Sequence, residues 1–274
     1  MTGSNKGIGF ATVKHLCGSF DGDVILCSRD PKRGEEAVAK LQQQGLQPKL
    51  AQLDILDHSS IEQLRNRLVN DYGGLDVLVN NAAIAFPRVC DVPFLTQVEA
   101  TLGTNYFATA TVCDILFPIL KPHARVVNVS SVLGMLSVVP AAELRQRLSS
   151  KNLTRHDLDS LAHEFVNDVR TGAHLEKGWP ASAYGTSKVL LSALSFVQHR
   201  MLQEDQREDL VVNVVHPGYV DTDMSGHKGP LTPDQGCVSS VKAALVAPGG
   251  EPRGQFLWHD GSVVDWASDV KSFK

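Results

Sequence analysis

Tyr184 and Lys188 stand four residues apart in the segment YGTSK, and this spacing places two side chains on one face of a helix. A lysine ammonium beside a tyrosine hydroxyl favours the phenolate, so the pair predicts a lowered tyrosine pKa. A phenol tuned in this way can donate a proton to a carbonyl oxygen near neutral pH. The pair by itself is also compatible with a half-exposed helix on which the two residues are incidental.

A glycine-rich turn lies near the start of the chain, in the segment TGSNKGIG over residues 2–9. Gly3, Gly7 and Gly9 permit a tight turn into the apolar pattern that follows. Backbone N–H groups at the start of such a helix can hold a pyrophosphate. An ordinary glycine-rich turn is the alternative, because a single fingerprint of this kind is weakly specific.

Further segments follow in an order that is much more specific. They are DVLVNNAA over 76–83, Thr104-Asn105, VVNVSS over 126–131 and His216-Pro217-Gly218. With the glycine turn and the YGTSK segment, they resemble the short-chain dehydrogenase/reductase family across essentially the whole chain. Within that family, the chain resembles the NADPH-dependent, monomeric carbonyl reductases on Asp54-Ile55, YGGLD over 72–76, EKGWP over 176–180 and GQF over 254–256.

The resemblance implies four catalytic residues. Tyr184 would donate the proton, Lys188 would lower its pKa and bind the nicotinamide ribose, and Ser131 would polarise the substrate carbonyl. Asn105 would hold a water that links Lys188 to solvent, and the alternative is a helix-interior amide that bonds the backbone. Ser130 is expected to be structural. The implied reaction is the reduction of aldehydes, ketones or quinones, with prostaglandins and steroids as further candidates, to alcohols by hydride from a nicotinamide.

NADPH is the expected cofactor. The second strand ends in Cys27-Ser28-Arg29, without the acidic residue that holds the ribose in NAD-binding relatives. The Arg29 guanidinium suits a 2′-phosphate, and the resemblance adds Lys6 as a second cation. The other positions that the resemblance assigns to cofactor binding are Gly3, Asn5, Gly7, Ile8 and Gly9, Asp54 at the adenine with Ile55, Asn81 over the adjacent ribose, Tyr184 and Lys188, and Pro217, Gly218, Val220 and Thr222 beside the carboxamide.

Ser131 and Tyr219 are the expected substrate-binding residues. Tyr219 stands where similar carbonyl reductases tend to carry tryptophan, so the wall of the substrate site differs. Val215 and His216 stand where vertebrate members carry a cysteine pair linked to the binding of glutathione conjugates, which leaves that interaction open. His216 is expected to be a strand-end residue and not a catalytic one.

Composition narrows the choice of partners and compartment. The 274 residues carry 26 Lys and Arg against 30 Asp and Glu, a net charge of −4 with no basic block, so we expect no nucleic-acid or membrane partner. No leader and no apolar run of about 18 residues is found. Five dispersed cysteines fit reduced thiols in the cytoplasm, and the histidines lack metal-ligand spacing, so no metal site is expected.

Strand patterns alternate with helical ones, which predicts a parallel sheet with right-handed crossovers. The resemblance implies that this is a Rossmann-type, doubly wound sheet in a single domain over 1–274. A helix is expected over 34–44, ending at Gly45, and another is expected to be capped by Ser59 or Ser60. The expected strands are 24–27, 50–53, 77–80, 125–129, 211–215 and 255–258.

A long connection separates Ser131 from Tyr184, and about residues 140–179 look like an insertion. Within it, Thr154 and Asp157 open a helical pattern. In the carbonyl reductases that the chain resembles, this insertion covers a helix face that other members use for dimerisation, so we expect a monomer. The alternative is a surface decoration without effect on assembly.

In this family a buried strand leads directly into the Thr-Gly turn, whereas here Met1 immediately precedes Thr2. That strand would lie between the strands at Val24 and Val77, so its absence is expected to split the sheet. The sequence is then incomplete or belongs to a real short form. An active reductase and a non-catalytic or unstable truncated relative therefore remain as two classes of function, although all four catalytic positions are filled.

Overall fold

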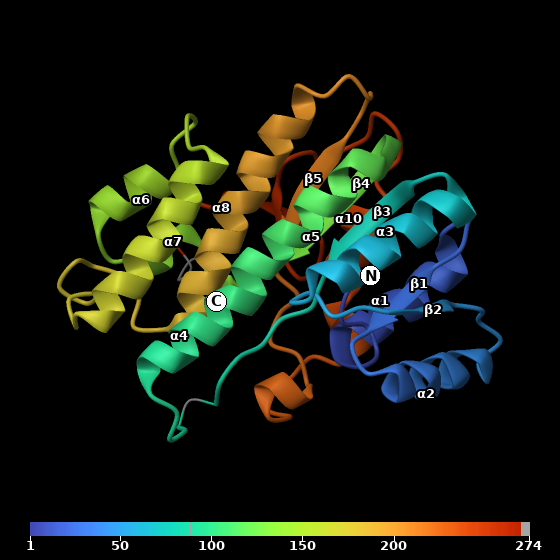
Figure 1. Ribbon diagram of the computed structural model, residues 1–274, viewed down its shortest axis with the longest axis horizontal. Helices are drawn as coiled ribbons and strands as arrows, with labels where there is room; N and C mark the ends of the chain where they lie inside the picture. The colour runs from blue at the N-terminus through green and yellow to red at the C-terminus, as the bar shows by residue number, and fades with distance from the viewer. Residues whose placement is uncertain (88, 270–274) are drawn as a thin grey trace.

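A twisted sheet forms the centre of the molecule, with helices on both faces (Figure 1). The computed structural model describes residues 1–87 and 89–269. The larger part of the sheet has the order β3 (Leu75–Asn80), β4 (Leu120–Val129), β5 (Val211–Val215), β6 (Phe256–Leu257), β7 (Val263–Val264). Its strands run parallel except for β7, which pairs antiparallel with β6. A separate parallel pair is formed by β1 (Ile25–Ser28) and β2 (Lys49–Gln52).

The first two residues lie between β1 and β3. Met1 donates its N–H to Ile25 O at 2.9 Å and accepts from Cys27 N at 3.1 Å. Thr2 donates to Val79 O at 3.0 Å, on the opposite side. Successive residues that bond to opposite neighbours are the pattern of a central parallel strand. The predicted split of the sheet is confirmed, and these two residues connect its parts.

Neighbouring side chains of β4 point to opposite faces of the sheet. Val126 is buried with α3 and α5, whereas Val127 is buried with α1, α2 and α10. Apolar runs on both faces are what a doubly covered parallel sheet requires. These helices are α1 (Gly7–Ser19), α2 (Pro31–Gln42), α3 (His58–Tyr72), α5 (Thr109–Leu116) and α10 (Val238–Ala244). The predicted α/β architecture is therefore present.

The start of α3 differs from the sequence prediction. Asp57, not Ser59 or Ser60, is the N-cap, and its carboxylate accepts from Ser59 N at 3.0 Å. The Ser60 hydroxyl instead accepts from Asp54 N at 3.0 Å. The serines lie inside the first turn because Asp57, two residues before Ser59, supplies the capping acceptor.

Two helices, α6 (Ala142–Leu148) and α7 (Arg155–Arg170), form the segment before α8 (Ala183–Gln203). Figure 1 shows them on the side of the molecule away from α2. The predicted helix start is confirmed, since Thr154 and Asp157 form a reciprocal capping box. Phe165 of α7 and Trp179 lie in one buried cluster with Leu190 and Leu194 of α8. The segment therefore covers an apolar face of α8, as expected.

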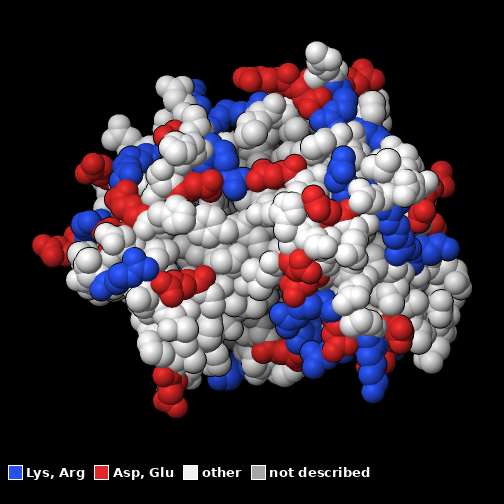
Figure 2. Space-filling model, in the orientation of Figure 1, with Lys and Arg blue, Asp and Glu red and all other residues white. Residues whose placement is uncertain are grey.

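The remaining connections carry short elements. A π-helical stretch, η1, joins α4 to α5 without a break. No helix in the described ranges 1–87 and 89–269 is long and apolar enough to cross a membrane. Acidic and basic residues are interspersed on the face in Figure 2. The short elements are α4 (Phe94–Leu102), η1 (Gly103–Ala108), η2 (Phe117–Ile119), η3 (Val132–Gly134), η4 (Leu136–Val138), η5 (Asp223–Ser225) and α9 (Pro233–Gly236).

Candidate functional site

Tyr184 and Lys188 lie one turn apart at the start of α8. The helix begins there because the Ser182 side chain accepts from Gly185 N at 3.0 Å, which satisfies one free N–H of the first turn. Lys188 Nζ is 5.7 Å from the centroid of the Tyr184 ring. The predicted placement of the two side chains on one helix face is confirmed.

The predicted lowering of the tyrosine pKa is wrong for the chain by itself. Burial raises the pKa of Tyr184 to about 12, and only a hydrogen bond with Ser131 acts in the other direction. Burial also lowers the pKa of Lys188 to about 7. Lys188 Nζ donates to Val129 O at 2.7 Å, so its nitrogen is directed to the end of β4. Desolvation is therefore the main cause of both pKa shifts.

Ser131 follows β4 and opens η3. Its hydroxyl accepts from Leu133 N at 3.2 Å, and Ser131 is near enough to Tyr184 to lower the pKa of the phenol. The neighbouring Ser130 is buried, and its hydroxyl donates to Lys188 O at 3.1 Å. The structural part expected of Ser130 is confirmed, and the polarisation of a carbonyl by Ser131 stays a prediction.

Asn105 lies in η1 and is fully buried. Its side-chain oxygen accepts from Ile84 N at 2.8 Å, and its nitrogen donates to Ile84 O at 2.9 Å and to Ser187 Oγ at 3.0 Å. The amide thus fixes the segment after β3 against α8. This geometry favours the alternative reading, an interior amide that bonds the backbone. The water that the resemblance assigns to Asn105 stays a prediction.

His216 directly follows β5, so the expected strand-end position is confirmed, and its ring meets backbone groups that the sequence did not predict. Its Nδ1 accepts from Val132 N at 3.0 Å, next to Ser131, and from Gly218 N at 3.3 Å. Burial lowers the pKa of the imidazole to about 3. Its position after a predicted strand was the sequence feature that pointed to His216. That position does not predict which backbone N–H groups donate to the imidazole.

The glycine turn forms a cradle into which few side chains would fit. Gly3 and Gly7 have φ angles of +57°, and a Cβ at Gly3 would lie 2.9 Å from Ala82. A Cβ at Gly9 would lie 2.6 Å from the Asn81 amide. The N-cap of α1 is Lys6, whose side chain forms no capping bond within residues 1–87 and 89–269. The first N–H groups of this helix can therefore bind an anion, which fits the pyrophosphate of a dinucleotide.

The Asn81 side chain is hydrogen-bonded to the backbone of the glycine turn. Its amide donates to Thr2 O at 3.1 Å and to Gly3 O at 2.9 Å. Farther along the same edge of the sheet, Asp54 Oδ1 accepts from Leu56 N at 3.0 Å, and Ile55 is part of the core. The expected places of these side chains at a ribose and an adenine stay predictions.

A hollow of about 350 Å³ lies between the glycine turn, α2 and η5. Lys6 Nζ bonds Asp223 Oδ2 there at 2.6 Å, so the expected second cation already has an acidic partner. Arg29 is exposed at the end of β1 and does not line the hollow. Arg33, four residues further along the chain, lines the hollow. No role for Arg33 was predicted from the sequence. The lining residues are Asn5, Lys6, Arg33, Glu36, Ala37, Lys40 and Asp223.

The loop after β5 approaches the same turn. Val220 is buried and pairs with Leu231, whereas Tyr219 is 54% exposed. The Thr222 methyl lies 3.3 Å from where a Cβ of Gly7 would be, so the loop touches the cradle. Gly218 has a φ of +87°, which favours glycine between Pro217 and the tyrosine.

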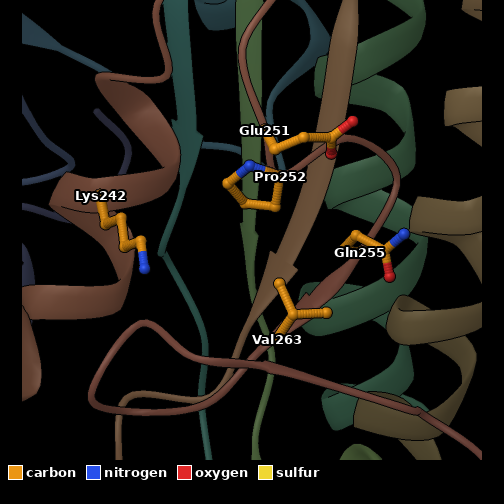
Figure 3. Close-up of a pocket in the computed structure, with 5 residues that line it drawn as sticks. All are labelled: Lys242, Glu251, Pro252, Gln255 and Val263. Atoms are coloured by element: carbon orange, nitrogen blue, oxygen red, sulfur yellow. The ribbon is translucent and has the colours of Figure 1, made fainter.

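A second hollow, of about 400 Å³, lies beside α10 and β7 (Figure 3). None of the predicted site residues lines it. Lys242 Nζ at its edge donates to Gly261 O at 2.6 Å. The lining residues are Lys242, Glu251, Pro252, Gln255 and Val263.

Comparison with known proteins gives the family. A family model described as short chain dehydrogenase matches residues 1–173. Carbonyl reductase (NADPH) 1 of Rattus norvegicus is 47% identical over 269 residues, 97% of each chain, and that of Homo sapiens is 46% identical over 260 residues, 94% of each chain. Salutaridine reductase from Papaver somniferum has a similar structure, with a TM-score of 0.83 and 29% identity over 93% of this chain and 97% of that one. The chain belongs to the short-chain dehydrogenase family.

Proposed function

We propose that this chain reduces carbonyl compounds to alcohols with NADPH. The observation that carries the proposal is the placement of Ser131, which lowers the pKa of Tyr184, and of Lys188 beside that tyrosine at the carboxyl edge of the sheet. Ligands of open α/β sheets bind at this edge. The relatives at 46–47% identity are named carbonyl reductases that use NADPH, which supports the same activity here.

The cradle at Gly3, Gly7 and Gly9 fits the pyrophosphate, and Lys6, Arg29 and Arg33 are the cations at the end where a 2′-phosphate would lie. Bound NADPH supplies the hydride for the reaction. The loop that carries Thr222 touches the cradle and would contact the carboxamide. Asp54, Ile55, Asn81, Pro217, Gly218 and Val220 complete the proposed binding residues, with Asn5 and Ile8 in the turn.

The protein groups then act on the carbonyl oxygen. Ser131 and Tyr184 present two hydroxyls to it, which orients and polarises the carbonyl. Tyr184 is protonated at neutral pH, since its pKa lies near 12, and it donates its proton to the oxygen. Lys188 in its ammonium form favours the phenolate that remains, and burial places the Lys188 pKa near 7. The substrate wall includes the exposed Tyr219.

Aldehydes, ketones and quinones are the proposed substrates. Because the segment 140–179 covers a face of α8, we propose that the protein is a monomer. The described cysteines are free thiols, which supports a reducing compartment, the cytoplasm.

The test is NADPH consumption by the purified chain with a quinone such as menadione, followed by absorbance. The expected result is turnover that depends on the quinone and is faster with NADPH than with NADH. A chain that binds NADPH but transfers no hydride to any aldehyde, ketone or quinone would support the non-catalytic alternative instead.

A further inference from the structure

His216 is anchored through its backbone at the point where β5 ends. Its N–H donates to Leu257 O at 2.8 Å, and its carbonyl accepts from the Ser239 hydroxyl at 3.3 Å. The ring is buried and packs against Trp258, with 4.5 Å between the ring centroids and an interplanar angle of 61°. The imidazole therefore has a fixed position relative to the sheet.

The ring joins the turn after β4, which begins at Ser131, to the loop after β5. Nδ1 accepts from Val132 N on one side and from Gly218 N on the other. A nitrogen that accepts carries no proton, so the ring proton lies on Nε2. The Nδ1 atom of His216 thus holds the turn after β4 and the loop after β5 together.

The turn after β4 has two N–H groups that need partners. Ser131 accepts from Leu133 N through its own hydroxyl, and His216 accepts from Val132 N. Without the imidazole acceptor, the Val132 N–H is unpaired and the turn is free to relax. A small displacement there moves the Ser131 hydroxyl away from the phenol, and such displacements reduce turnover strongly.

We propose that His216 is a positioning residue for the reaction, and that its Nδ1 holds the Ser131 hydroxyl against Tyr184. The inference rests on the proposed carbonyl reduction. It also predicts a property of the unreacted protein, since the nearby Ser131 lowers the Tyr184 pKa whether or not a substrate turns over.

Two substitutions separate positioning from packing. His216→Asn keeps an acceptor oxygen near the place of Nδ1 but loses the aromatic ring, whereas His216→Phe keeps a ring against Trp258 but loses the acceptor. His259→Phe is the control, because His259 shares the ring contact yet forms no hydrogen bond to Val132 or Gly218 among the described residues.

The readouts are kcat with a quinone, Kd for NADPH, melting temperature, and the Tyr184 titration followed by NMR on ring-labelled tyrosine. We expect His216→Phe to lower kcat by about tenfold or more with Kd retained, because misplacement affects chemistry and not cofactor binding. Its Tyr184 pKa should rise. His216→Asn should keep most of kcat and the original Tyr184 pKa. Its melting temperature should be lower than that of His216→Phe, because it loses the aromatic ring.

If His216 had a purely structural role, kcat would follow the melting temperature. The His216→Phe variant would then have a higher kcat than His216→Asn. That order, or an unchanged Tyr184 pKa in His216→Phe, would overturn the inference. If the unsubstituted chain reduces no carbonyl but the Tyr184 pKa responds as predicted, the proposed function fails and the positioning of the two hydroxyls stands.

Discussion

Tyr184 and Lys188 show how burial, more than pairing, sets the properties of single residues in this site. Burial raises the pKa of one and lowers that of the other, so both move toward their neutral forms. The spacing in the sequence predicted which side chains share a face. It could not predict that Lys188 bonds Val129 O or that His216 meets Val132 N, because these partners come from distant segments.

The lowered pKa of Lys188 has a consequence for stability. Between the folded value near 7 and the unfolded value near 10.5, the unfolded chain binds more protons, so the free energy of unfolding should rise with pH in this window and fall as pH decreases toward 7. Lys188→Met removes this slope. From pH 7 to 9, we expect the unsubstituted chain to gain on the order of 2 kcal/mol relative to the variant.

Urea unfolding at several pH values measures this difference. Lys40→Met, at an exposed position on α2, is the matched control and should follow the unsubstituted chain. Parallel pH profiles for Lys188→Met and the unsubstituted chain would mean that Lys188 is not desolvated in the folded state.

The choice of cofactor can be tested at the cations around the glycine turn. A charge-assisted bond to a 2′-phosphate is worth about 1–3 kcal/mol. Arg29→Asp should therefore lower kcat/KM for NADPH by about tenfold or more and leave NADH binding nearly unchanged. Lys32→Asp, an exposed position outside the hollow, is the control. If Arg29→Asp keeps the NADPH preference, the phosphate lies at Lys6 and Arg33.

At the scale of helices and strands, the repeating apolar patterns predicted the main elements, and β5 has the predicted bounds. The sequence could not predict the π-helical η1, since its Asn105 bonds Ile84 in another segment. The predicted start of α3 was also wrong, because Asp57 caps the helix and the predicted caps Ser59 and Ser60 lie inside it. Local sequence patterns specify whether a segment is a helix or a strand. Individual hydrogen bonds, several of them between distant segments, decide where a helix begins and where its turns become irregular.

The contact between α7 and α8 gives a prediction at this scale. Phe165 is fully buried against Trp179, with 5.2 Å between the ring centroids. Phe165→Ala should lower the free energy of unfolding by about 3–5 kcal/mol, since it leaves a cavity. It should also loosen the cover over α8. Ser160→Ala, on the exposed side of α7, should change neither property.

Denaturant unfolding and light scattering measure the two effects. The unsubstituted protein should scatter as a monomer, and partial self-association is expected for Phe165→Ala. A stable dimer before substitution would show that the segment 140–179 does not close the α8 face.

At the scale of the whole molecule, the segment of residues 1–4 connects the two parts of the sheet among the described residues. Met1 pairs with β1 and Thr2 with β3, so the flanking strands are connected at one end and lack a ladder over the rest of their length. The glycine turn at Gly3 follows directly from this contact. The stability of the sheet and the position of the cofactor cradle therefore depend on the same short segment, in which Ser4 N also donates to Cys27 O at 2.9 Å.

A strand placed before Met1 should strengthen both. Each buried valine or isoleucine contributes about 1.5–3 kcal/mol, so an added run of roughly five such residues should raise the melting temperature and tighten NADPH binding. An extension of equal length made of glycine and serine is the control. Equal melting temperatures for the two extensions would contradict this account of the gap between β1 and β3.

The central claim is that the Tyr184 hydroxyl donates the proton to the carbonyl oxygen. Tyr184→Phe keeps the ring and removes that hydroxyl, and Tyr219→Phe does the same in the exposed loop. With saturating NADPH and a quinone or aldehyde, kcat of Tyr184→Phe should fall by about 10²-fold or more while Kd for NADPH is unchanged, and Tyr219→Phe should retain its turnover. Near-full kcat in Tyr184→Phe would contradict the assignment of the proton donor.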